Sequence, residues 1–272
     1  MTSGQAVLRP PRAIVRSDAA SWALQGALDR KGLGPVAGVD EAGRGACAGP
    51  LVVASAVLRP ADAKRLAGLT DSKLLTPAAR ERIYDLILRC AEDYDVVVVP
   101  PEEVDARGVH VANIEGMRRA VARLREHPGY VLTDGFVVPG LTAPSMGIVA
   151  GDKAVACVAA ASVLAKVTRD RIMARLHDEL PQYGFDLHKG YCTATHRQAL
   201  EVHGPAEVHR WSYANVVSAA AAHGLSAPRR VVRSVAATGV VQNGKTRDNP
   251  RYGSGDGPGA ERGMKEAGRM SG

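Results

Sequence analysis

The feature that most constrains the fold is a short apolar run that ends abruptly in acidic residues and a glycine-rich turn. Residues 36–39 lead into Asp40 and Glu41, and the turn that follows carries one arginine, Arg44. A second apolar run, 51–58, leaves the turn and is apolar enough to be a strand buried on both faces. This order of strand, acids, flexible turn and strand indicates chemistry at the end of a strand.

Further segments alternate between strand and helix patterns. The β-branched run 94–99 and the apolar runs 130–134 and 145–149 predict strands. Helical spacing of apolar residues predicts helices over about 77–92, 111–126, 155–179, 195–203 and 212–222, with a short one near residue 102. Thr76 and Pro77 suit the cap and the first position of the first of these helices. Strands that alternate with helices favour an α/β fold around a central sheet.

The chain divides into four parts by composition. We expect a flexible leader over 1–16, an N-terminal helix over 17–33, one folded domain over 34–225 that includes C-terminal helices, and a disordered basic tail over 226–272. The tail holds nine Lys/Arg against four Asp/Glu, which accounts for +5 of the net charge of +7. The charge therefore favours a polyanionic partner mainly through the tail, and a role in holding DNA non-specifically is our hypothesis for it.

Composition also excludes several classes of protein. No apolar run approaches the roughly 20 residues of a membrane helix, and prolines and polar residues occupy the place of a secretory signal. The four cysteines are scattered without zinc spacing, so we expect reduced thiols. We therefore expect a cytoplasmic protein with no membrane partner.

Acidic residues recur at strand ends. Asp40, Glu41, Asp134 and Asp152 each lie at, or just past, the end of an apolar strand, and ligands of α/β sheets bind at strand ends. Bringing four carboxylates together is costly unless cations neutralise them, and Mg²⁺ or Mn²⁺ take such oxygen ligands. Two such ions can activate water and stabilise a leaving oxygen in phosphodiester cleavage. The alternative is that each acid only forms a turn, as Asp before Gly often does.

Nucleotide-binding motifs do not fit the turn. Its glycines are spaced G-x-G-x-x-x-G, which is one residue too long for the dinucleotide fingerprint. A phosphate-binding loop would need Lys-Ser or Lys-Thr where Pro50 stands.

With these residues in view, the chain resembles bacterial ribonuclease HII. The motifs that carry the resemblance occur in the family's order between about residues 36 and 219: Gly38-Val-Asp40-Glu41-Ala-Gly43-Arg44-Gly45, Asp71-Ser72-Lys73, Asp134-Gly135, Gly151-Asp152, Ala160-Ala-Ser162-Val-Leu-Ala-Lys166-Val-Thr168-Arg169-Asp170 and Tyr183-Gly-Phe185…His188-Lys189-Gly190-Tyr191. Ala46 departs from the proline of many members, which loosens the turn and removes no ligand.

The resemblance implies a fold, an activity and a site. The fold is a ribonuclease H-like mixed sheet flanked by helices with a helical C-terminal extension. The activity is endonucleolytic cleavage of RNA in RNA–DNA hybrids and incision at single ribonucleotides in duplex DNA, leaving 5′-phosphate and 3′-hydroxyl ends. The four acids match the catalytic, metal-binding carboxylates, with two ions of Mg²⁺ or Mn²⁺. Gly43, Arg44 and Gly45 match the loop that senses the ribose 2′-hydroxyl, and Tyr191 matches the tyrosine that stacks near the RNA–DNA junction.

Other residues have two interpretations each. Lys166 contacts a phosphate or is a solvated helix charge, with Asp170 as its i,i+4 partner or a residue behind the metal ligands. Ser72 and Lys73 contact backbone phosphates or form an ordinary entry to a helix. Tyr191 is a stacking platform or a packed surface tyrosine.

Two other functions stay open at this point. One is a structure-specific DNA nuclease such as a junction resolvase. The 43–45 loop and Tyr191 are evidence against it. The other is a binding protein whose acids are structural. We expect a monomer that binds RNA–DNA hybrid and ribonucleotide-containing DNA, with replication or repair proteins as candidate partners.

Overall fold

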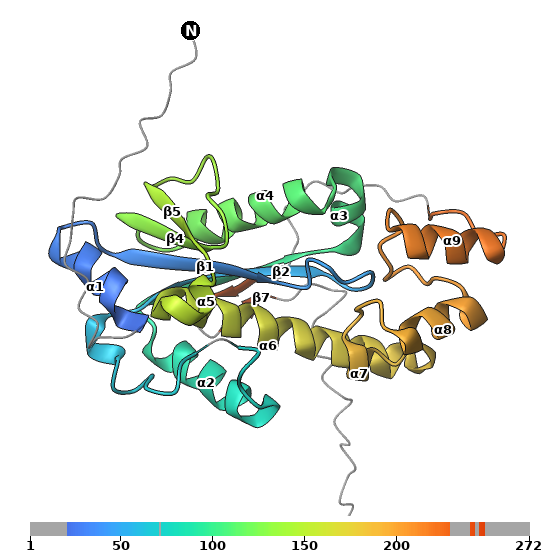
Figure 1. Ribbon diagram of the computed structural model, residues 1–272, viewed down its shortest axis with the longest axis horizontal. Helices are drawn as coiled ribbons and strands as arrows, with labels where there is room; N and C mark the ends of the chain where they lie inside the picture. Colours follow the sequence, from blue (N-terminus) through green and yellow to red (C-terminus); the bar gives the residue numbers. More distant parts are fainter. Residues whose placement is uncertain (1–20, 71, 229–239, 243–244, 248–272) are drawn as a thin grey trace, which may run out of the picture.

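The computed structural model describes residues 21–70, 72–228, 240–242 and 245–247, and for the last six it describes only the backbone. The expected leader 1–16, Asp71 and most of the expected tail lie outside these ranges. Within them, one sheet is covered by helices on both faces, and no helix is long and apolar enough to cross a membrane (Figure 1).

A mixed sheet forms the centre of the described residues. Its strand order is β5-β4-β1-β2-β3-β6-β7. Strand β1 pairs parallel with β4 and antiparallel with β2, and β4 pairs parallel with β5. The strands are β1 Val36–Ala42, β2 Leu51–Val57, β3 Asp93–Val99, β4 Tyr130–Asp134, β5 Ser145–Ile148, β6 Val240–Gln242 and β7 Lys245–Arg247.

Helices cover the two faces and one end of this sheet (Figure 1). Helix α6 packs on β1 and β2 with α2 outside it, and α4 packs on β2 and β3 with α3 beside it. The helices are α1 Ala23–Arg30, α2 Pro77–Cys90, α3 Pro101–Arg107, α4 Val109–Ala122, α5 Gly151–Ala154, α6 Ala156–Glu179, α7 Phe185–His188, α8 Ala194–His203 and α9 Ala214–Ala222. Short 3-10 turns precede α2 and α7, at Pro60–Asp62 and Pro181–Tyr183.

Alternate residues of the strands supply two separate cores. On β2, Val52 and Ala54 lie in the core under α6, whereas Leu51 and Val53 lie in the core under α4. Successive side chains of a strand point to opposite faces, so a strand that is apolar throughout is covered on both sides. The expected α/β fold with a mixed sheet and C-terminal helices is confirmed.

Helix α6 lies unusually close to β1. A Cβ atom added at Gly38 would lie 2.1 Å from the carbonyl carbon of Cys157 and 2.3 Å from the nitrogen of Val158. The first half of α6 faces the sheet with alanines such as Ala160 and Ala161, which are fully buried. Small side chains on both elements therefore let the helix backbone approach the strand backbone directly.

The loop between α7 and α8 is held by a buried histidine network. The Ala206 N–H donates to His209 Nδ1 (3.0 Å), so His209 Nε2–H donates to His196 Nε2 (3.1 Å), and His196 Nδ1–H donates to the Tyr191 carbonyl (3.0 Å). His188 stacks on His196 with ring centroids 4.4 Å apart. Burial lowers the pKa of His196 to about 4, so this ring bonds in its neutral form.

The structure differs from the expected elements near the ends of the chain and in two short helices, α5 and α7, which the apolar spacing did not predict. The expected helix 17–33 is a helix only from Ala23 to Arg30 within the described residues, without a side-chain cap. Thr76 does cap α2, because its hydroxyl accepts from the Ala79 N–H at 3.2 Å. Within the segment expected to be disordered, the structure has the short strands β6 and β7, and β6 pairs with β3. All four cysteines are free.

Replacing Gly38 tests the close contact of α6 and β1. Gly38→Ala should lower the free energy of unfolding by about 3 kcal/mol or more, since the new methyl group meets backbone that cannot move aside. Urea unfolding measures this change. Gly26→Ala is the matched control: its Cβ meets only the end of Arg30 at 3.4 Å, so it should stabilise α1 by up to about 1 kcal/mol. Equal stabilities of Gly38→Ala and the parent would contradict the contact.

Protonation of His196 should make stability depend on pH. A folded pKa of about 4, against about 6.5 when unfolded, means that the unfolded chain takes up the proton first as pH falls. Above pH 6.5, protonation of His196 should not change the free energy of unfolding. Between pH 6.5 and 4 the free energy of unfolding should fall as pH falls, by at most about 1.4 kcal/mol per pH unit. Urea unfolding of His196→Gln should show a flatter dependence in that window, whereas exposed His127→Gln should match the parent. A parental slope in His196→Gln would refute this assignment.

Candidate active site

Three carboxylates converge at the ends of the central strands. Asp40 on β1 and Asp134 on β4 come from adjacent parallel strands, whose register pairs Val39 with Thr133. Asp152 comes from the first turn of α5, which leads directly into α6. One carboxylate oxygen from each residue lies within 4.8 Å of the others. The tertiary fold therefore brings together three of the four predicted acids as one cluster.

A strained turn supports this cluster. Ala150 has a left-handed backbone, with φ +54°, which is uncommon for a residue with a side chain. The turn points the Gly151 N–H at Asp134, whose Oδ1 accepts it at 2.7 Å. Backbone strain of this kind persists where the surrounding structure holds a functional geometry.

Burial makes Asp40 costly to ionise. Burial raises its pKa well above the usual value, and the neighbouring Glu41 and Asp134 raise it further, while hydrogen bonds from the Ser162 hydroxyl and the Glu41 N–H lower it. The side chain is only 5% exposed. A carboxyl group in this setting is costly to ionise unless a cation lies beside it.

Glu41 lies on the other side of the strand. Adjacent residues of a strand face opposite ways, so Glu41 points toward α4 when Asp40 points toward α6. Burial raises the Glu41 pKa, Arg44 lowers it, Asp134 raises it, and Asn113 and Lys73 lower it. The Arg44 Nη1 atom is 3.9 Å from Glu41 Oε1. Glu41 is thus close enough to Asp134 to feel its charge but lies outside the three-residue cluster.

The donor set suits a hard divalent cation. Asp40 and Asp152 are 5% and 4% exposed, and one oxygen of each is gathered with one of Asp134. Lys73 Nζ lies 3.5 Å from Asp152 Oδ2 and forms an ion pair with the cluster. Carboxylate oxygens at this spacing are what Mg²⁺ and Mn²⁺ prefer.

The glycine loop begins where β1 ends. Gly43 has φ +87° and closes a turn in which its carbonyl accepts from the Ala46 N–H (3.2 Å). Arg44 and Gly45 are exposed, and the Arg44 guanidinium lies 5.6 Å from the centre of the Phe136 ring. A Cβ added at Gly45 would meet nothing within 4 Å. Open space therefore adjoins the loop backbone beside the acids.

Tyr191 lies on a second loop that contacts the first. The Gly190 carbonyl accepts from the N–H groups of Cys47 (3.0 Å) and Ala48 (3.3 Å), which ties the two loops together. The Tyr191 side chain is 40% exposed, and the buried Arg169 guanidinium lies 5.4 Å from its ring centre. One face of the ring is supported and part of the residue is free, as a stacking platform requires.

Two predicted substrate contacts have other partners. Ser72 is 2% exposed and its hydroxyl bonds at 2.9 Å to that of Ser162, which in turn bonds Asp40. Lys166 donates to Asp170 at 2.7 Å, which is the helix pairing weighed as the alternative. Lys73, in contrast, is 75% exposed and reaches the cluster.

Residues that the strand-end pattern did not single out also shape the site. Ser162 touches Asp40, Asn113 faces Glu41, and the fully buried Arg169 and Arg210 bind carbonyls of the two loops. Each lies on an element distant in sequence. Ser162 gave a sequence signal, as a polar residue in the apolar first half of α6, whereas Arg169 lies among other charged residues and gave none.

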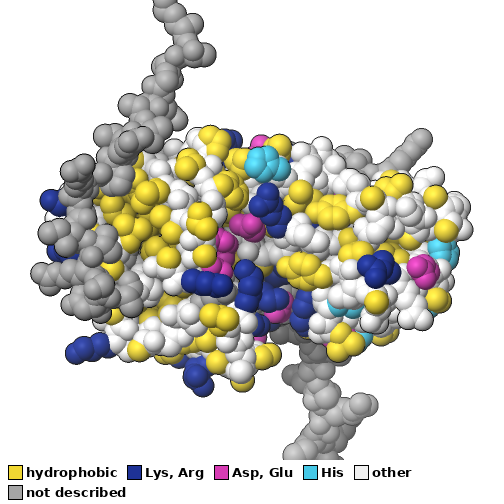
Figure 2. Space-filling view, viewed as in Figure 1, with side chains coloured by type: hydrophobic (Ala, Val, Ile, Leu, Met, Phe, Trp, Pro, Cys, Tyr) yellow, Lys and Arg dark blue, Asp and Glu magenta, His cyan; other side chains and the backbone are white. Residues whose placement is uncertain are grey.

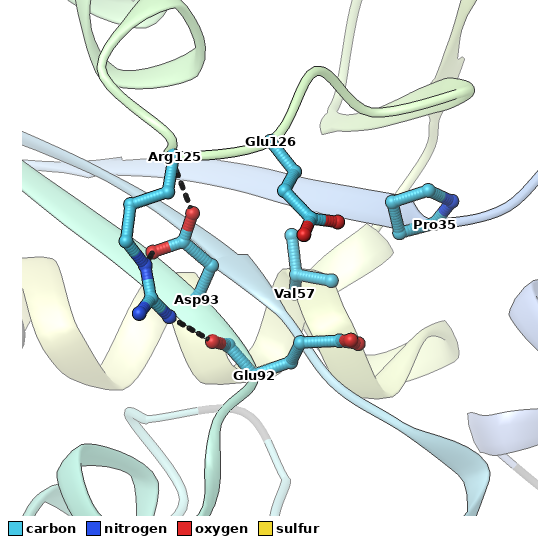
Figure 3. Close-up of a pocket in the computed structure, with 6 residues that line it drawn as sticks. All are labelled: Pro35, Val57, Glu92, Asp93, Arg125 and Glu126. Atoms are coloured by element: carbon cyan, nitrogen blue, oxygen red, sulfur yellow. Dashed lines mark hydrogen bonds and ion pairs between the residues drawn. The ribbon is translucent and has the colours of Figure 1, made fainter.

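The surface around the acids is basic. Figure 2 shows acidic side chains gathered near the middle of one face, with lysine and arginine side chains around them. A separate pocket lies at the opposite end of the strands, where Arg125 binds Asp93 and the Glu92 carbonyl beside Pro35 (Figure 3). Its arginine is already paired, and the pocket is remote from the carboxylate cluster.

Comparisons with known proteins agree with this geometry. A sequence model of the family described as Ribonuclease HII matches residues 37–216. The ribonuclease HII of Saccharopolyspora erythraea is 67% identical over 208 residues, which cover 76% of this chain and 91% of the relative. The crystal structure of ribonuclease H2 from Pyrococcus horikoshii has 32% identity and a TM-score of 0.62, over 68% of this chain and 96% of that one. Bst-RNase HIII in complex with Mn²⁺ has 21% identity and a TM-score of 0.59 over 72% of each chain, and shares the fold.

These matches decide between the functions left open by the sequence. A junction resolvase and a binding protein with structural acids are both wrong, because the family match spans the strands that carry the acids and both loops. The chain belongs to the ribonuclease HII family and is a ribonuclease H-type endoribonuclease, a hydrolase that acts on RNA–DNA hybrids.

Proposed function

We propose that this enzyme also incises duplex DNA at single embedded ribonucleotides, leaving 5′-phosphate and 3′-hydroxyl ends. The observation that carries the proposal is the continuity of β1: the strand that supplies Asp40 runs directly into a loop whose exposed backbone at Gly45 borders open space. A site built this way can examine one sugar next to the bond that is cut. A site that recognises one 2′-hydroxyl can bind a substrate that contains a single ribonucleotide and does not require a long RNA strand.

Divalent cations fit the acids as the cofactor, with Mg²⁺ or Mn²⁺ as the ions. Asp40, Asp134 and Asp152 would hold one ion, and Glu41 would complete a second position on the far side of Asp40. When bound, such ions activate water and stabilise the leaving oxygen. The family neighbour crystallised with Mn²⁺ has the same fold.

The chain's own residues orient the substrate. Arg44 is exposed beside Glu41 and can hold a phosphate, and the loop amides can bond a 2′-hydroxyl, which both donates and accepts. Tyr191 offers a supported ring for the sugar or base at the junction. Lys73 lies near enough to Asp152 to neutralise charge before a cation binds and to contact phosphate afterwards.

The test of the proposal uses three duplexes of one sequence: one with a single ribonucleotide, one all DNA and one continuous RNA–DNA hybrid. We expect cleavage of the first and third with Mg²⁺ or Mn²⁺, and products whose 3′ ends prime a DNA polymerase. Equal cutting of the all-DNA duplex would overturn the ribose assignment. Cutting of the hybrid alone would overturn only the single-ribonucleotide step.

Replacing Asp134 tests the cation site. Asp134→Asn removes one charge but keeps the oxygen that accepts from the Gly151 N–H. Cleavage should fall by at least about a hundredfold, as for loss of one charge-stabilising group, while duplex binding persists. In EDTA the variant should be more stable by on the order of 1 kcal/mol, because a like charge is gone. Mg²⁺ should stabilise the parent more than the variant.

Calorimetry and urea unfolding measure these effects, with exposed Asp178→Asn as the control acid. Full cleavage by Asp134→Asn would remove the carboxylate cluster from the mechanism. An equal gain in stability from Mg²⁺ in both proteins would place the cation elsewhere.

Replacing Gly45 tests the loop as the ribose sensor. Gly45→Ala adds a methyl group to open space, so the free energy of unfolding should change by less than about 0.5 kcal/mol. Incision at a single ribonucleotide should fall about tenfold or more, because the methyl group takes the place of the sugar. Single-turnover rates on the three duplexes measure this. Gly68→Ala, whose Cβ would make only ordinary contact at 3.5 Å, is the control, and parental rates for Gly45→Ala would exclude a close sugar contact.

A further inference from the structure

A buried arginine holds the glycine loop from beneath. Arg210 is 0% exposed and lies about 165 residues further along the chain than the loop. Its guanidinium donates to the carbonyls of Gly43 (2.7 Å), Arg44 (2.9 Å) and Gly49 (3.2 Å). One side chain thus binds both ends of the turn that follows β1.

Tyr213 completes the same arrangement. Its hydroxyl accepts from Arg210 Nη1 at 3.0 Å and donates to the Arg44 carbonyl at 2.9 Å. The guanidinium lies 5.5 Å from the Tyr213 ring centre. The Arg44 carbonyl therefore accepts two hydrogen bonds, one from Arg210 and one from Tyr213, and both fix the direction in which it points.

Fixing these carbonyls fixes the amides on the other side of the same peptide planes. In a trans peptide unit the C=O and the following N–H point in opposite directions. The carbonyls of Gly43 and Arg44 point inward to Arg210, so the N–H groups of Arg44 and Gly45 point away from it. Within the described residues no backbone carbonyl accepts from either N–H group, and the space beside Gly45 is open.

Burial of the guanidinium is costly, and stability alone gives little reason for it. A buried charge must be fully hydrogen-bonded to be tolerated, and an apolar side chain of similar size often serves stability as well. Here the bonds of Arg210 are directed to the carbonyls of the loop. Arg169 binds the carbonyls of Ala48, Pro50 and Lys189 in the same way, from the Tyr191 side.

We propose that Arg210 and Tyr213 are positioning residues for ribose recognition: they aim the N–H groups of Arg44 and Gly45 at the sugar of the ribonucleotide. The inference rests on the proposed function, in which this loop senses the 2′-hydroxyl. It adds that the specificity of the loop is set by two residues of the segment before α9, outside the loop itself.

The test measures discrimination as a ratio of dissociation constants. Binding of all-DNA and single-ribonucleotide duplexes is compared in the uncut Asp134→Asn background. Tyr213→Phe removes only the hydroxyl that bridges Arg210 and the Arg44 carbonyl. Its ratio should fall about fivefold, the size of one hydrogen bond, with binding of all-DNA duplex unchanged. Arg210→Lys, which cannot reach three carbonyls at once, should lower the ratio further.

Ser212→Ala is the matched control. It removes the neighbouring hydroxyl, which donates to Asp105 at 2.7 Å and not to a carbonyl of the loop. It should keep the parental ratio. A Tyr213→Phe protein that loses stability but keeps the parental ratio would overturn the proposal and leave a structural role. If the Arg210→Lys chain does not fold, Tyr213→Phe alone decides the outcome.

The parent separates this proposal from the function on which it rests. No preference of the Asp134→Asn parent for the ribonucleotide duplex would mean that the loop does not sense the sugar, and both proposals fail. A clear preference in the parent, unchanged in Tyr213→Phe, would overturn only the positioning role. A second readout is amide hydrogen exchange: Arg44 and Gly45 should become protected on binding the ribonucleotide duplex and not the all-DNA duplex.

Discussion

The backbone contact between α6 and β1 at Gly38 is the constraint on which the rest of the structure depends. With no side chain on the strand and alanines on the helix, α6 lies directly on the sheet. That placement brings the Ser162 hydroxyl to Asp40 and sets α5, with Asp152, beside Asp134. Further along the same helix, Arg169 donates hydrogen bonds to carbonyls of both loops. Larger side chains would hold the helix further from the sheet. Ser162 would then lie further from Asp40, Asp152 from Asp134, and Arg169 from the loop carbonyls.

The site is a balance between repulsion and support. Carboxylates within 4.8 Å of one another oppose folding, and the pKa of Asp40 is raised by its burial and by the neighbouring Glu41 and Asp134. Hydrogen bonds from Ser162 and from the N–H groups of Glu41 and Gly151 offset part of the repulsion. The negative charge that these hydrogen bonds do not offset favours the binding of a cation. Such trade-offs of stability for function are common at active sites.

Arginine has two different roles in this protein. Arg44 is exposed at the loop, where its charge can meet a phosphate. Arg169 and Arg210 are buried and use the planar fork of the guanidinium to bind several carbonyls at once, which a lysine could not do. Net charge alone, which pointed to the tail, did not separate these roles.

The sequence by itself determined the elements and the chemistry. Apolar and β-branched runs predicted the five strands of the body. Thr76 and Pro77 predicted the start of α2, and acids at strand ends predicted a metal-dependent nuclease before the family resemblance made it specific. These signals are local, since periodicity, capping and strand ends involve neighbouring residues. Only the tertiary structure decided that Asp40, Asp134 and Asp152 meet within 4.8 Å, that Ser72 is buried against Ser162, and that Arg210 lies under the glycine loop. Those facts depend on which strands pair and on how closely helices approach them, and no local pattern contains the distance between residues 165 positions apart.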